Sequence, residues 1–137
     1  MDCSLCESPV VVFSIPSDYR GFVPEKTSLV GVCTHCLTLE PAGTNEAASE
    51  GDRSEPDFSR ISDAFPTAPE QAIPLALAID RCSSLATNRA AIESLLHAVE
   101  RAGADPLLAI DRLCADPTVE PIIDLERRAH QLEQLLY

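Results

Sequence analysis

The segment Cys3-Ser4-Leu5-Cys6 has the same form as Cys33-Thr34-His35-Cys36, so the chain carries two C-x2-C pairs separated by 26 residues. Two tight turns of this kind can place four thiolates around one tetrahedral metal ion. Zinc is the usual metal of such four-cysteine sites in small structural modules. The spacing therefore predicts one Zn²⁺ per chain, bound by Cys3, Cys6, Cys33 and Cys36.

Three features leave alternatives open at this site. Four thiolates at this spacing also form rubredoxin-type iron centres, which would make the chain an electron carrier, although aromatic residues are only 4% of the chain. Glycine usually follows the second cysteine of each turn, where φ is positive, but Glu7 and Leu37 stand there, so we expect less regular turns. His35 is a candidate for a contact close to the metal, and simple solvent exposure is the plainer interpretation.

The chain is strongly acidic, with a formal net charge of −12 and Lys26 as its one lysine beside nine arginines. Such a surface repels nucleic acid phosphates and acidic membranes. Acidic, lysine-poor composition is also typical of halophilic proteins, because at molar salt the Debye length falls to about 3 Å and screens self-repulsion. We therefore expect a halophilic protein, and its acidity then says little about partners.

No basic segment followed by an apolar one opens the chain, and the longest apolar run, over residues 72–79, is too short to span a bilayer. These features predict a cytoplasmic protein that does not enter the membrane. A reducing cytoplasm favours metal binding over disulfides for the paired cysteines.

The first 40 residues predict a zinc ribbon. Two β-branched runs, over residues 9–15 and 28–32, indicate strands, and the loop between them contains Pro16, Gly21 and Pro24. So small a unit has too few large side chains for a sufficient core, so bound metal should contribute on the order of 10 kcal/mol to its folding.

Residues 41–63 are rich in Gly, Ser, Pro and acids, with Phe58 as almost their only apolar residue, and they predict an acidic flexible linker. From residue 64 to residue 137 the apolar spacing becomes helical, which predicts a bundle of three to four helices. The expected fold class is therefore α+β, with a small N-terminal β ribbon followed by a helical bundle.

Several residues mark the expected helix ends. A first apolar stripe runs from Leu75 to Ala86, and Pro74 is tolerable only in the first turn of that helix. Asn88 is the expected N-cap of the second helix, and Asp105 caps a third that follows Gly103. The last helix is expected over residues 118–136, and its apolar stripe could also serve as a homodimer seam.

No catalytic set of residues is evident. Cys82 and Cys114 lie on apolar helical stripes and are expected to fill the core, while His97 and His130 have no neighbouring nucleophile or carboxylate arrangement in the pattern. We therefore expect that the protein is not an enzyme.

The chain resembles a family of small, uncharacterised haloarchaeal proteins with an N-terminal zinc ribbon. The resemblance rests on residues 1–6, on the Cys33-Thr34-His35-Cys36 pair, on residues 88–93 and on residues 103–108 with the following Leu113. It implies zinc and halophily, and it implies no activity.

These observations favour a non-enzymatic zinc-binding protein that serves as a protein-interaction or regulatory module with a protein partner not yet identified. An alternative is association with nucleic acid through the ribbon, for which Arg20 and Lys26 in the interstrand loop are the candidate contacts. The iron electron carrier is a second alternative.

Overall fold

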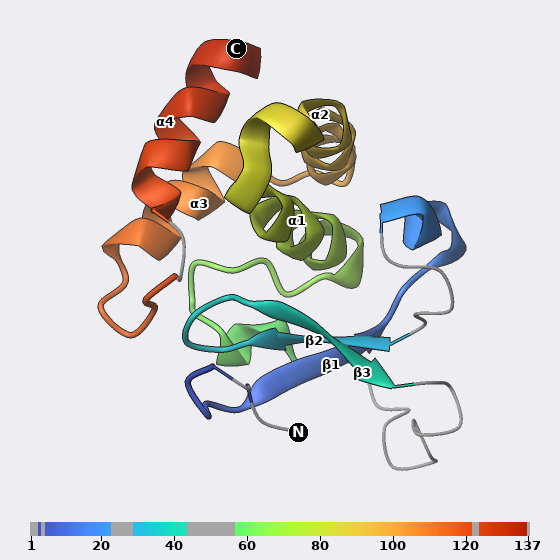
Figure 1. Cartoon of the computed structure of the whole chain (residues 1–137), viewed down its shortest axis with the longest axis vertical. Coiled ribbons are helices and arrows are strands. Elements are labelled where there is room, and N and C mark those ends of the chain that lie inside the picture. Colours follow the sequence, from blue (N-terminus) through green and yellow to red (C-terminus); the bar gives the residue numbers. More distant parts are fainter. Residues whose placement is uncertain (1–2, 4, 23–28, 44–56, 122–123, 137) are drawn as a thin grey trace.

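The computed structural model describes residues 3, 5–22, 29–43, 57–121 and 124–136, and places a small sheet beneath a layer of helices (Figure 1). The sheet comes first in the chain and the four α-helices follow. The predicted α+β class is confirmed. Among these described residues, no helix is long and apolar enough to cross a membrane.

Three antiparallel strands form the sheet in the order β1-β2-β3. They are β1 (Val10–Ser14), β2 (Leu29–Cys33) and β3 (Leu39–Gly43). The first two lie where the β-branched runs predict strands, and their register places Val10 opposite Cys33. That pairing places the start of β1, which follows the first cysteine pair, beside the end of β2, which carries the second pair.

Strand β3 was not predicted, and it crosses the expected boundary between ribbon and linker at residue 40. Its sequence, Leu39-Glu40-Pro41-Ala42-Gly43, contains two residues that disfavour strands. Proline is tolerated here because β3 pairs with β2 alone and lies at the edge of the sheet. The sheet of the ribbon therefore ends at Gly43, three residues beyond the end at residue 40 that the sequence predicts.

The helices are α1 (Pro69–Arg81), α2 (Leu85–Arg101), α3 (Pro106–Ala115) and α4 (Leu125–Leu136). Short 3₁₀ turns, η1 (Ser17–Phe22), η3 (Phe58–Arg60) and η4 (Cys82–Ser84), lie between the larger elements. The predicted Asp105 cap is confirmed, since its carboxylate accepts the Leu108 N–H at 3.1 Å.

Two local helix predictions are wrong. Pro74 lies in the sixth position of α1 rather than in its first turn, and the surrounding helix tolerates the missing N–H because the segment is buried against the sheet and α2. Asn88 is not an N-cap: α2 begins at Leu85, and the Asn88 side-chain amide instead donates to the Arg81 carbonyl at the end of α1, at 3.2 Å.

The last helix also begins later than predicted, at Leu125 rather than near residue 118. Asp124 caps it by accepting the Arg127 N–H at 3.1 Å. Apolar spacing predicts helix from about residue 118, but Val119 is buried outside the helix, in the segment that follows α3. Ile122, which the same spacing places on the helix, lies outside the described residues.

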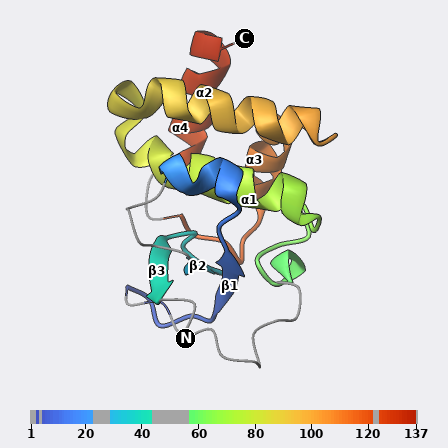
Figure 2. The same cartoon turned by 90° about the vertical axis from the view of Figure 1, so that its right-hand side faces the viewer.

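One apolar core joins the sheet to the helices. It contains Val11, Phe13 and Val32 from the strands together with residues of all four helices. Figure 2 shows the helical layer standing over one face of the sheet, with α1 nearest to it.

The end of the expected linker belongs to this core. Phe58 is 0% exposed, and its ring lies 5.4 Å from that of Phe13 and 6.0 Å from that of Phe65, measured between ring centroids. Residues 44–56 of the expected linker lie outside the described residues, whereas Phe58 and Ile61 belong to the same apolar core as the sheet and the helices.

Candidate metal centre

The two cysteine pairs lie at the edge of the sheet where β1 begins and β2 ends. Cys3 and Cys6 precede β1, Cys33 is the last residue of β2, and Cys36 lies in the turn to β3. Thr34 of the second pair binds the segment that links the first pair to β1, because its N–H and its hydroxyl both donate to the Pro9 carbonyl, at 3.0 and 2.8 Å. The pairing of β1 with β2 thus fixes the separation of the two turns.

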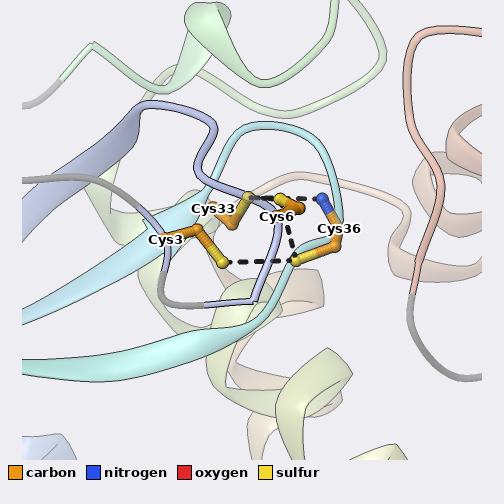
Figure 3. Close-up of side chains that lie close together, drawn as sticks. All are labelled: Cys3, Cys6, Cys33 and Cys36. Atoms are coloured by element: carbon orange, nitrogen blue, oxygen red, sulfur yellow. Dashed lines mark hydrogen bonds between the residues drawn. The ribbon is translucent and has the colours of Figure 1, made fainter.

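All four cysteine sulfurs converge on one point, as Figure 3 shows. They lie within 4.8 Å of one another, and three of the separations are 3.6 Å (Cys3 to Cys36), 3.4 Å (Cys6 to Cys33) and 3.7 Å (Cys6 to Cys36). Sulfurs held about 2.3 Å from a tetrahedral zinc ion lie about 3.8 Å apart. The spacing predicted from the sequence therefore produces a cluster of the size that one metal ion requires.

The two turns repeat the same backbone hydrogen bond. The N–H of Cys3 donates to the carbonyl of Ser8 and the N–H of Cys33 donates to the carbonyl of Thr38, both at 2.9 Å. In each pair the first sulfur also accepts a backbone N–H from two residues later: Leu5 donates to Cys3 at 3.4 Å, and His35 donates to Cys33 at 3.3 Å. Such bonds offset the negative charge of a metal-bound thiolate.

The irregular turns expected from the absence of glycine are not found. Glu7 and Leu37, which follow the second cysteine of each pair, have φ values of 62° and 60°. These are the left-handed conformations that glycine normally supplies, and a side chain there costs about 1–2 kcal/mol. The chain keeps the geometry of the turns at that cost, which is offset at Leu37 by burial of its side chain.

The thiols differ in their surroundings. Hydrogen bonds from Ser8 lower the pKa of Cys6 to about 6, whereas burial raises the pKa of Cys33 to about 12 and raises that of Cys36 as well. Cys6 is thus ionised near neutral pH without metal, and Cys33 carries a proton that a metal ion must displace.

The His35 ring turns toward the segment after α3. Its Nδ1 lies 2.9 Å from the Thr118 carbonyl, and its Nε2 lies 3.3 Å from the Glu120 carboxylate. The His35 carbonyl also accepts the Glu120 N–H, at 2.7 Å. His35 therefore contributes its backbone N–H to the Cys33 sulfur and its ring to a contact with the helical part of the chain.

The same segment is anchored at its other end. The Ser62 hydroxyl donates to the Asp116 carboxylate, and the Thr118 N–H and hydroxyl donate to the same carboxylate at 2.8 and 2.7 Å. These bonds lower the pKa of Asp116. A continuous set of hydrogen bonds thus links the second cysteine turn, residues 116–120 and the segment that holds Ser62. Sequence reasoning missed this link, because nothing in the local pattern pairs His35 with residues more than eighty positions away.

Among the side chains that the structure describes, no other candidate residue joins the cluster. Arg20 belongs to η1 with its side chain outside the described part, and Lys26 lies outside the described residues altogether. Cys82 is 0% exposed, and burial raises its pKa to about 12, in accord with the expected core position. Cys114 is half-buried, and His97 and His130 are exposed.

Comparison with known proteins places the chain beside one family. A model described as a family of unknown function (DUF6276) matches residues 2–136. No curated protein and no solved structure matches the chain.

Proposed function

The chain belongs to this family of unknown function, DUF6276, and from that premise we propose that it is a non-enzymatic protein with one structural zinc ion, acting as a protein-interaction or regulatory module. The single observation that carries the proposal is the convergence of four cysteine sulfurs within 4.8 Å. Four protein ligands complete a tetrahedral site and leave no position for a substrate, which is the arrangement of structural rather than catalytic zinc.

Zinc is preferred to iron on the chemistry of the surroundings. Both ions accept four thiolates. The cysteine cluster packs with Val10 and Val12, and the described aromatic contacts lie elsewhere, among Phe13, Phe58 and Phe65 and between Tyr19 and Phe22. The aromatic shell expected around a rubredoxin-type iron is thus not found among the described residues, which supports a redox-inert metal.

A structural role fits the position of the site. Bound metal would close both turns against each other at the edge of β1 and β2, and the second turn carries the His35 contact to residues 116–120. In this proposal the metal holds the sheet in the shape against which the helices pack. It supplies folding free energy, on the order of 10 kcal/mol in small zinc modules, and takes no part in a reaction.

The interaction function is tested by affinity purification with the zinc-loaded full chain as bait, beside a Cys33→Ser bait. The proposal predicts a stoichiometric protein partner with the wild-type chain and its loss with Cys33→Ser, whose folded surface is disrupted. Repeated catalytic turnover of a small molecule by the purified chain would contradict the proposal. The absence of any stoichiometric protein partner under native salt conditions would also contradict it.

A further inference from the structure

An open groove of about 1440 Å³ lies between α3, α4 and the C-terminal end of α2. Figure 1 shows α3 and α4 side by side at one end of the helical layer. The apolar residues that line the groove are Ala104, Pro106, Leu107, Leu108 and Ala129. The groove is separate from the cysteine cluster, and the metal proposal does not use it.

Leu108 is the most exposed apolar side chain of the groove. It is 45% exposed, whereas Ile110 and Leu113 of the same helix are 0% exposed. Among the side chains whose exposure the structure describes, Leu5 in the first cysteine turn is the only other large apolar one with comparable exposure. Leucine at such a position offers a contact to a partner at little cost to the folded chain.

The groove is more acidic than the chain as a whole. Six of its sixteen lining residues are acidic, against 22 of 137 in the full sequence. They are Glu100, Asp105, Asp111, Asp124, Glu126 and Glu133. The basic side chains of the lining are Arg127 and His130. A groove whose lining combines apolar and acidic residues complements a helix that has an apolar stripe flanked by lysine or arginine.

We propose that this groove binds a short basic amphipathic helix of a protein partner. The inference rests on the proposed interaction function and specifies its partner surface. The lining helices have 10 and 12 residues, so they extend about 15–18 Å and match about three turns of a bound helix. A second copy of this chain would bring acids against acids, and a nucleic acid would bring phosphates, so neither matches the groove in charge.

The probe is a fluorescent peptide of about 15 residues, with leucines spaced 3 and 4 apart and lysines elsewhere, long enough to form a helix on binding. Its binding to the zinc-loaded full chain is measured by anisotropy at about 0.15 M and about 1 M salt. We expect Leu108→Asp to weaken binding about tenfold or more at about 1 M salt, where attraction between the added carboxylate and the lysines of the peptide is screened. Asp111→Lys with Glu133→Lys should weaken it by a similar factor mainly at the lower concentration.

Matched controls separate the groove from general attraction between opposite charges. Asp63→Lys with Glu93→Lys changes the net charge by the same amount at exposed positions outside the groove and should leave binding within about twofold. A peptide of the same composition in scrambled order should bind at least about tenfold more weakly. Equal binding of the scrambled peptide, or an equal loss in the control variant, would overturn the proposal. Circular dichroism of each variant establishes that it is folded.

Two further outcomes separate this inference from the proposed function. A natural partner that purifies equally with wild type and with Leu108→Asp would keep the interaction function and overturn the groove. A wild-type dimer that Leu108→Asp converts to a monomer, measured by sedimentation, would also overturn the proposal, because the occupant would then be a second copy.

Discussion

The Nδ1 of His35 lies 2.9 Å from the carbonyl oxygen of Thr118, which is 83 residues further along the chain. Because a carbonyl oxygen only accepts, the ring nitrogen must carry the hydrogen. The second cysteine turn and the segment after α3 are therefore joined by a side-chain hydrogen bond in addition to the backbone bond from Glu120 to His35.

This contact predicts the effect of His35→Ala. The variant should retain its metal, since the ring is not among the four ligands, and should lose about 1–2 kcal/mol of unfolding free energy through the lost hydrogen bond. Denaturant unfolding and metal analysis measure the two quantities. His97→Ala, at an exposed position on α2, is the control and should change the free energy by less than about 0.5 kcal/mol. Loss of metal in His35→Ala would place the ring at the metal instead.

Positive φ at Glu7 predicts a stabilising glycine. Glu7 is exposed and has a φ of 62°, so Glu7→Gly should relieve backbone strain and raise the unfolding free energy by about 0.5–1 kcal/mol. Glu93→Gly, at an exposed position within α2, should lower it by about 1 kcal/mol. Thermal unfolding of both variants measures the two effects. If both lowered the midpoint alike, the left-handed turn at Glu7 would be contradicted.

Burial of Phe58 predicts that the sheet and the helices unfold together. Phe58→Ala removes a ring that contacts Phe13 of the sheet and Phe65, and should cost about 3–5 kcal/mol. The near-ultraviolet signal of Tyr19, which lies in η1 between β1 and β2, and the far-ultraviolet helix signal should then shift to the same lower midpoint. Two separated transitions, with the helical one unchanged, would instead indicate independent units joined by a linker.

The unequal pKa values of the thiols predict how metal binding depends on pH. The pKa of Cys33 is raised to about 12, so its proton must leave when metal binds, and metal affinity should fall as pH falls. The pKa of Cys6 is lowered to about 6 chiefly by Ser8, so at pH 7 this thiol contributes little to proton release. Ser8→Ala should therefore release more protons per metal ion than the wild type. Calorimetry in buffers of different ionisation enthalpy measures this number, and an unchanged number would contradict the role of Ser8.

The sequence predicted those parts of the molecule that depend on near neighbours. The β-branched runs of β1 and β2 and the Asp105 cap depend on residues a few positions apart, and the structure has strands and a cap at these places. Each C-x2-C turn is equally local, and the pairing of β1 with β2 brings the two turns and their four sulfurs together. Strand β3 was missed because Pro41 and Gly43 disfavour strands, and only pairing with β2 makes a strand there.

The remaining misses involve contacts between distant parts of the chain. Asn88 has the side chain of an N-cap, but the carbonyl of Arg81 is its hydrogen-bond partner. Phe58 stands in a polar segment, and its burial depends on where the sheet and α1 leave space. Composition and periodicity carry no information about either arrangement, because both follow from tertiary packing.

The central claim is that Cys3, Cys6, Cys33 and Cys36 hold one structural zinc ion, and metal content tests it most directly. Wild type, Cys33→Ser and the core control Cys82→Ser are purified without added metal. Their metal content per chain is then measured by inductively coupled plasma mass spectrometry. We predict one zinc per chain in the wild type and in Cys82→Ser, and none in Cys33→Ser, which should also lose on the order of 5 kcal/mol or more of stability. Iron in place of zinc, no metal in the wild type, or a full zinc complement in Cys33→Ser would contradict the account.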